Sequence, residues 1–209
     1  MKNLPSHATI REFLQAVASP DEAHGAVSVA AVSAGLGTSV LLLVATLPQT
    51  RGDSVDDRAR LAEAAAGLSE VQEQLLETVE TETAVKIFAA RNMPQGSAPQ
   101  RAERQAAIQF ALRASAEVPL EVMRLCAGAL KHAQTVAAHA TRAASTDIQL
   151  GMGLLETAFE GARSNLEAKL SNLIDAQYIT SVVDEIARLA EDVVAVVRAT
   201  DGLLQVPPA

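Results

Sequence analysis

The chain has 209 residues, a formal charge of −8 and a hydrophobic fraction of 49%, yet only 2% of its residues are aromatic. So high a hydrophobic fraction excludes a disordered or collagen-like chain. The single cysteine, Cys126, excludes a disulfide scaffold and favours a reducing, cytoplasmic compartment. The acidic balance and the scarcity of aromatic residues argue against a nucleic-acid-binding surface.

The first predicted helix covers about residues 9–17, where apolar side chains three and four positions apart share one face. The polar opening at residues 1–5 shows no sign of a targeting segment. The run from Gly25 to Thr50 carries no charge and is long enough to span a bilayer. Its hydroxyl residues, glycines and alanines make it only mildly hydrophobic. We therefore predict a helix over 25–47 that is buried at the centre of the fold, with no membrane as partner.

A long amphipathic helix is predicted from about residue 54 to residue 91, and the sequence Asn92-Met93-Pro94 ends it. The clearest loop of the chain follows at 95–99. A further helix then carries Ile108 toward Pro119. This proline either kinks that helix or occupies the first turn of the next one.

Two more helices complete the predicted set. A helix-start signal at Ser145-Thr146-Asp147 opens one that reaches about residue 173. Another runs from about residue 180 to residue 202. The tail at 206–209 is expected to fray.

Together these elements predict one all-α domain over residues 1–205, an antiparallel bundle of six to eight helices with no sheet. No alternating apolar run supports a strand, and no internal repeat occurs. Gly35 and Gly37, with the alanine-rich faces around them, suit the close approach of neighbouring helices. Because small residues bury little area each, we also expect a second copy to cover these faces in a homodimer.

Familiar catalytic motifs are absent from the sequence. The four histidines lack the spacing of a metal site, and no P-loop, dinucleotide or serine-hydrolase motif occurs, so we predict no metal. His132 and His139 share one helix face and are interpreted as partly exposed helix residues. Cys126 lies in an apolar segment and is interpreted as a buried thiol.

Several short motifs nevertheless follow one another in a recognisable order. The strongest reads Arg104-x-x-x-Ile108-Gln109-x-Ala111-Leu112, followed by Ala116-x-Val118-Pro119-Leu120. Weaker matches are Ser19-Pro20, Ala90-Arg91-Asn92-Met93-Pro94, Thr146-Asp147 and Asn165. Over residues 8–175 this order resembles the cyclodeaminase/cyclohydrolase family, found in the second domain of formiminotransferase-cyclodeaminase and in bacterial methenyltetrahydrofolate cyclohydrolases.

The resemblance implies an all-helical homodimer that binds a tetrahydrofolate derivative as substrate or ligand. Members of the family hydrolyse the 5,10-methenyl bridge to 10-formyltetrahydrofolate, or close a formimino group with loss of ammonia. Both reactions need an electrophilic carbon held beside a polarised water or a leaving amine. Carboxylates and amides that steer protons suffice for this chemistry, without a metal or a covalent intermediate.

Position by position, the resemblance also implies a site. Glu80 and Asp147 are the candidate catalytic residues, either of which would orient the attacking water. The candidate substrate-binding residues, which share their motif positions with the family, are Gly25, Ser28, Arg51, Arg104 and Asn165. We expect all seven to converge on one ligand.

The departures from the family pattern fall at polar positions. The glycine-rich P-G-G-G-S loop reads His24-Gly25-Ala26-Val27-Ser28, and side chains at Ala26 and Val27 would crowd a ligand that needs bare backbone. Gln95 replaces a lysine, and Lys169 replaces the second asparagine of N-V-x-x-N. We favour a folate-dependent one-carbon enzyme of weak or altered activity. The alternative is a non-catalytic folate-binding or assembly protein that kept the dimeric scaffold.

Overall fold

The computed structural model describes residues 9–19, 26–50, 52, 54–79, 83–94 and 96–205. These residues form seven α-helices, two short 3-10 turns and no strand. The helices are α1 (Ile10–Ala18), α2 (Ala26–Thr46), α3 (Val55–Val79), α4 (Thr83–Arg91), α5 (Ala98–His139), α6 (Ser145–Leu170) and α7 (Ala176–Gln205). The predicted all-α class without a sheet is confirmed, whereas the predicted frayed tail at 206–209 lies outside the described residues.

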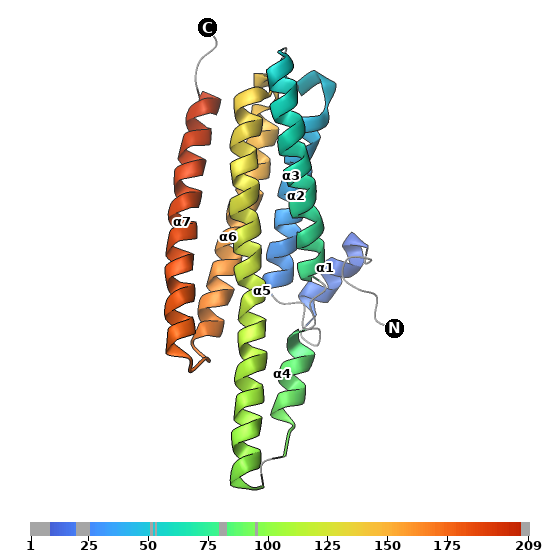
Figure 1. Cartoon of the computed structure of the whole chain (residues 1–209). Helices are drawn as coiled ribbons and strands as arrows, with labels where there is room; N and C mark the ends of the chain where they lie inside the picture. The colour runs from blue at the N-terminus through green and yellow to red at the C-terminus, as the bar shows by residue number, and fades with distance from the viewer. Residues whose placement is uncertain are drawn as a thin grey trace.

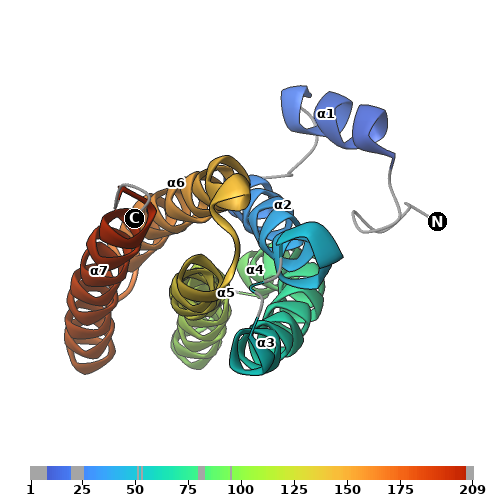
Figure 2. The same ribbon diagram turned by 90° about the horizontal axis from the view of Figure 1, so that it is seen from above.

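The helices form an elongated bundle in which α7, α6, α2 and α3 make an arc and α5 occupies its concave side (Figure 2). Helix α5 packs against α3, α6 and α7, and α2 packs against α3 and α6. The first half of α5 extends beyond the other long helices with α4 beside it (Figure 1). We call α4 together with residues 98–114 of α5 the arm.

The uncharged helix α2 is buried on one side only. Its inward face carries Ala34 and Leu41, which have no exposed surface, while Val29, Leu36 and Leu43 are 37%, 55% and 51% exposed. These three residues are seven positions apart and form one outward stripe. The prediction that residues 25–47 lie buried at the centre is therefore wrong, because the long helix α5 takes that place.

By length and composition, α2 is the one described helix that could cross a bilayer. In this structure the helix instead contacts α3 and α6 along its length. Hydroxyl groups of Thr38 and Ser39 donate to backbone carbonyls one turn earlier. Gln72 of α3 donates to the Ser39 hydroxyl across 2.6 Å, so a polar contact joins the two helices.

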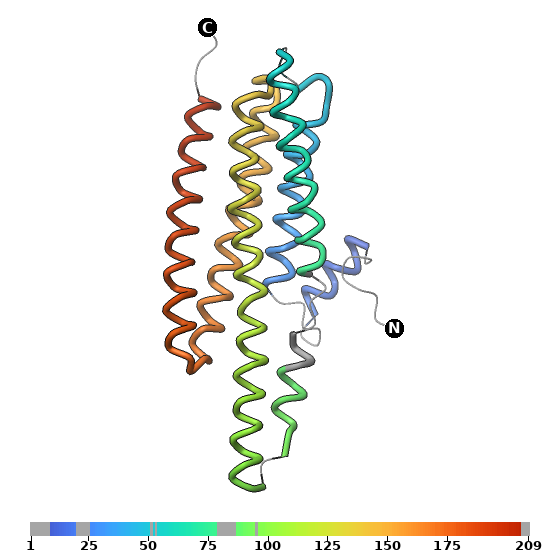
Figure 3. The backbone as a smooth tube through the Cα atoms, in the orientation of Figure 1, coloured from blue at the N-terminus to red at the C-terminus, as the bar shows by residue number. Residues whose placement is uncertain are grey.

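One expected helix is divided in the structure, and the alternative left open at Pro119 is decided. The single helix expected over 54–91 is divided into α3 and α4, separated by residues 80–82, which lie outside the described part of the chain. Conversely, α5 continues through Pro119 as one helix, a course that the backbone tube follows without a break (Figure 3). Buried Ala116, Leu120 and Met123 flank the proline, and their packing holds the helix together across it.

Close packing of α2 on α6 depends on small residues. A Cβ atom added to Gly37 would lie 2.7 Å from the backbone oxygen of Gly151, and one added to Gly151 would lie 2.8 Å from Cγ of Leu41. At Gly35 the added atom would meet nothing within 4 Å. Of the two glycines predicted to permit close approach, only Gly37 serves that purpose.

Candidate functional site

The seven predicted site residues differ in how far the structure describes them. Three lie outside the described part of the chain: Gly25, Arg51 and Glu80. Four lie within it, on three different helices: Ser28, Arg104, Asp147 and Asn165. Only these four can be placed relative to one another.

Ser28 and Asn165 lie at the same level of the bundle. Helices α2 and α6 run in opposite directions, and a Cβ atom on Gly161 would lie 3.8 Å from that of Ala30. The first turn of α2, which carries Ser28, is therefore level with the turn of α6 that leads to Asn165. Ser28 and Asn165, both half-buried, thus lie at the same level of two neighbouring helices.

Asp147 and Arg104 lie far from that level within one chain. Asp147 is exposed in the first turn of α6, 18 residues before Asn165, which corresponds to about 27 Å along the helix. Arg104 lies on the arm, where its Nε and Nη2 atoms donate to the Arg91 carbonyl across 3.0 and 2.8 Å. This contact caps the end of α4. A single copy of the chain does not gather these residues around one ligand.

A polar contact that the sequence interpretation did not reveal lies one turn beyond Asn165, where α5 crosses α6. The Lys169 ammonium donates to the Ser115 backbone oxygen across 2.9 Å and to its hydroxyl across 2.8 Å. Burial lowers the pKa of Lys169. One turn earlier, the Oδ1 atom of Asn165 is buried and accepts no hydrogen bond from the described residues.

A second polar group joins the start of α3 to the end of α5. His139 Nδ1 lies 2.8 Å from Asp57 Oδ1, and the Ser54 hydroxyl donates to Asp57 Oδ2 across 2.6 Å. Hydrogen bonds from Ser54 and then from His139 lower the pKa of Asp57. The His139 carbonyl accepts from the Gly52 amide, so this group also fastens the turn between α2 and α3.

His139 also lines a groove of about 620 Å³ between α3 and α5, together with charged residues of both helices, among them Arg60, Glu63 and Lys131. His132 lies in the same groove against Gly67, where its ring occupies the place of a side chain. Among the described residues, no three His, Cys, Asp or Glu side chains are grouped to hold a metal ion. Ser54 and Asp57, spaced as a helix cap, were the sequence signal for an ordered turn here.

Gln109 is a further residue whose role the motif alone did not reveal. Its amide nitrogen donates to the Asn172 carbonyl across 3.2 Å, and its amide oxygen accepts from the Ile174 amide across 3.0 Å. The side chain thus ties the arm side of α5 to the turn between α6 and α7. Gln109 therefore positions the backbone of this turn in the structure.

Cys126 lies in the buried part of α5 with no exposed surface. Burial raises the pKa of its thiol to about 12, which disfavours the reactive thiolate. The interpretation of Cys126 as a buried thiol is confirmed.

Comparison with known proteins indicates the family to which the chain belongs. A model of the formiminotransferase-cyclodeaminase family matches residues 9–188. Formimidoyltransferase-cyclodeaminase of Gallus gallus is 24% identical over 182 residues, 86% of this chain and 34% of the relative. The protein of that name from Sus scrofa is 25% identical over 188 residues, 89% of this chain and 35% of the relative. The chain thus spans about a third of the length of these relatives.

A solved structure of formiminotetrahydrofolate cyclodeaminase from Thermotoga maritima has the same fold, with a TM-score of 0.84 at 16% sequence identity. The match covers 95% of this chain and 96% of that one. The family model, for its part, extends from α1 into α7 and so includes both polar groups described above. The chain therefore belongs to the formiminotransferase-cyclodeaminase family.

Proposed function

We propose that the protein is a folate-dependent one-carbon enzyme of the cyclodeaminase/cyclohydrolase type, which forms or hydrolyses the methenyl bridge of tetrahydrofolate. One observation carries the proposal: the chain covers 96% of a solved formiminotetrahydrofolate cyclodeaminase but only 34% of the two-activity relative from Gallus gallus. We therefore expect this chain to have the cyclodeaminase activity that the name of that relative includes.

The described residues support a ligand position at the first turn of α2. There the Ser28 hydroxyl can donate a hydrogen bond, and the unpartnered Asn165 Oδ1 can accept one from an N–H group of the pterin. In this proposal Gly25 contributes backbone, and Glu80 steers the proton to or from the water or the leaving amine. Arg51 or Arg104 holds a folate carboxylate, which an otherwise acidic protein must bind with local basic residues.

The separation of about 27 Å between Asp147 and Asn165 bears on the quaternary structure. If both residues serve one ligand, two copies of the chain must supply them. The proposed active form is therefore a homodimer in which the site draws residues from both subunits, and Asp147 reaches the ligand bound by the partner.

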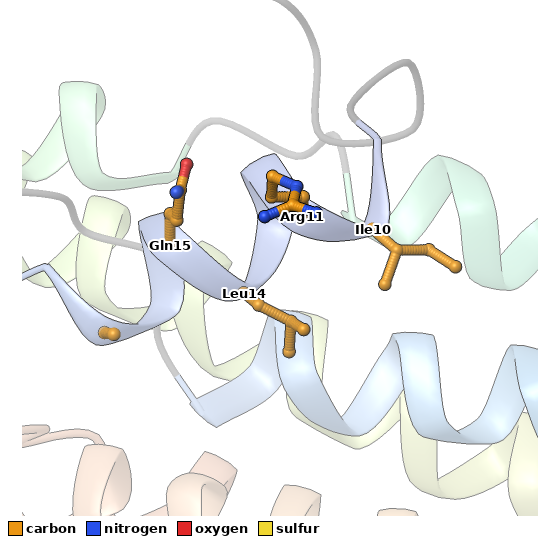
Figure 4. Close-up of a pocket in the computed structure, with 5 residues that line it drawn as sticks. Ile10, Arg11, Leu14 and Gln15 are labelled. Carbon is orange, nitrogen blue, oxygen red and sulfur yellow. The ribbon is translucent and has the colours of Figure 1, made fainter.

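Apolar surface supports the homodimer. The α2 stripe of Val29, Leu36 and Leu43 carries no charge, and Ile10 and Leu14 of α1 are 80% and 62% exposed. The side chains of α1 border a hollow of about 650 Å³ (Figure 4). Exposed apolar surface of this kind is typical of faces that a partner covers.

We expect the double variant Leu36→Glu with Leu43→Glu to be monomeric, because two carboxylates on the α2 stripe would be buried unpaired in the dimer. Light scattering should give a mass of 21.8 kDa for the variant and twice that value for the wild type. Leu76→Glu on α3, where the leucine is 48% exposed, is the matched control and should leave the dimer intact. A wild-type protein that scatters as a monomer at micromolar concentration would contradict the proposal.

Catalysis can be tested with 5,10-methenyltetrahydrofolate, whose near-UV absorbance disappears on hydrolysis, and with 5-formiminotetrahydrofolate, whose cyclisation releases ammonia. We expect Glu80→Gln to reduce turnover by about 10²–10⁴-fold, the usual contribution of a general acid or base. Glu73→Gln, a change of the same kind on exposed α3 surface, should leave the rate unchanged.

The alternative function would be established by a different outcome. If the wild-type protein binds reduced folate but turns over neither substrate, it is a non-catalytic folate-binding protein that kept the scaffold. If it binds no reduced folate at all, the folate assignment is wrong. The cytoplasmic location stays a prediction, based on the lone cysteine.

A further inference from the structure

Pro119 interrupts the backbone hydrogen bonding of α5 near its middle. Proline has no N–H, so position 119 cannot donate to the carbonyl of Ser115, four residues earlier. Ser115 is only 2% exposed, which leaves little access for water as a substitute donor. A buried carbonyl oxygen without a partner is costly, so another donor is needed at this point.

Lys169 of α6 supplies that donor. Its Nζ atom lies 2.9 Å from the Ser115 backbone oxygen and 2.8 Å from the Ser115 hydroxyl. An ammonium group on a flexible stem carries three N–H donors, which allows it to serve both oxygens at once. The lowered pKa of Lys169, caused by burial, fits an amine held against a helix rather than extended into solvent.

The same half of α5 is fastened to the turn after α6 and to the start of α7 by three further residues, one of which, Glu117, accepts a hydrogen bond from the Tyr178 hydroxyl across 2.7 Å. Gln109 bonds to the backbone of Asn172 and Ile174. Arg113 lies 4.2 Å above the ring of Tyr178 and 3.6 Å from Asp175. The α5 residues that make these contacts all precede Pro119. Lys169, by contrast, contacts α5 at the interruption itself.

A catalytic interpretation of the close Ser115–Lys169 pair fails on access. A serine activated by a lysine must reach its substrate, yet Ser115 is 2% exposed and the Lys169 amine is already hydrogen-bonded to its backbone oxygen. Lys169 replaces an asparagine of the family motif, but this replacement does not have to mean that a ligand-binding residue was simply lost. Its contacts give it a different task.

We propose that Lys169 is a positioning residue that replaces the backbone hydrogen bond removed by Pro119. It thereby fixes the angle at which the arm, with Arg104 upon it, leaves the bundle. This role depends only on the geometry of α5 and α6, and it holds whether or not the protein turns over a folate.

The test is a double-mutant cycle read by amide hydrogen exchange. Lys169→Met keeps the length of the side chain but removes its donors, and Pro119→Ala returns an N–H to the helix that can bond to the Ser115 oxygen. In the wild-type background, Lys169→Met should accelerate exchange of the amides at 105–118 by about tenfold. In the Pro119→Ala background the same change should have less than about a twofold effect.

Lys131→Met is the matched control, because Lys131 also lies on a helix face, pairing with Asp192 at 3.3 Å, but touches no interruption of α5. It should leave exchange at 105–118 unchanged. Equal effects of Lys169→Met in both backgrounds, or no effect in the wild type, would overturn the proposal. If Lys169→Met alone fails to fold, a folded double variant supports the proposal, and an unfolded double variant or an unfolded Pro119→Ala protein refutes it.

Discussion

Replacing Phe159 by alanine should lower the free energy of unfolding by about 3–5 kcal/mol, the usual cost of emptying a buried aromatic site. Phe159 of α6 is 1% exposed and is among the largest fully buried side chains of the described residues. The hydrophobic core that contains it consists mostly of alanine and leucine. Such side chains are too short to refill the space, so most of the cavity should persist.

Phe110→Ala is the matched control, because the same atoms are removed from a side chain that is 75% exposed. Its effect should stay within about 0.5 kcal/mol, as for other surface substitutions. Urea unfolding followed by far-UV circular dichroism at one fixed protein concentration measures both variants, since a dimer would make the midpoint concentration-dependent. Equal losses for the two variants would mean that the arm surface around Phe110 is covered in solution.

We expect Gly37→Ala and Gly35→Ala to change stability in opposite directions, although the residues are two positions apart on one helix. An added Cβ at Gly37 would lie 2.7 Å from a backbone oxygen and 3.1 Å from Leu155 Cγ. Because a backbone atom cannot swing aside, α2 and α6 must separate, at a cost of about 1–3 kcal/mol. At Gly35, where nothing lies within 4 Å, alanine should add about 0.5–1 kcal/mol through helix propensity.

Thermal unfolding of the two variants and the wild type provides the measurement. Gly153→Ala on α6, where an added Cβ also meets nothing within 4 Å, gives a second open position for comparison. A stabilising Gly37→Ala would contradict the tight α2–α6 approach. A destabilising Gly35→Ala would instead place another surface, such as a second copy of the chain, against the outer side of α2.

The predicted site shows how motif order and spatial position differ. Motif order places Asp147 and Asn165 in one set of polar positions, but both lie on the single helix α6, about 27 Å apart. Ser28 lies far from Asn165 in sequence and level with it in space, because α2 and α6 run antiparallel. A linear pattern carries no information on which helices are neighbours, so it could not separate these cases.

The helical class and the family membership followed from the sequence by itself. Amphipathic spacing, the absence of alternating apolar runs and the capping residues are local properties, and local properties decide where a chain becomes helical. The predicted start of α6 at Ser145 is confirmed, although no side chain caps this end of the helix. The ordered motifs also sufficed to identify the family, since a match over residues 9–188 confirms it.

Only the tertiary structure decided which helix lies at the centre and what the polar departures do. The uncharged α2 was a reasonable central helix by composition, yet α5 is central because its 42 residues contact helices on several sides. The sequence shows only that Lys169 replaces an asparagine of the family motif, whereas the structure shows that its ammonium donates to the Ser115 carbonyl of α5. Burial and partnership depend on contacts between residues distant in sequence, and those contacts exist only once the helices have packed.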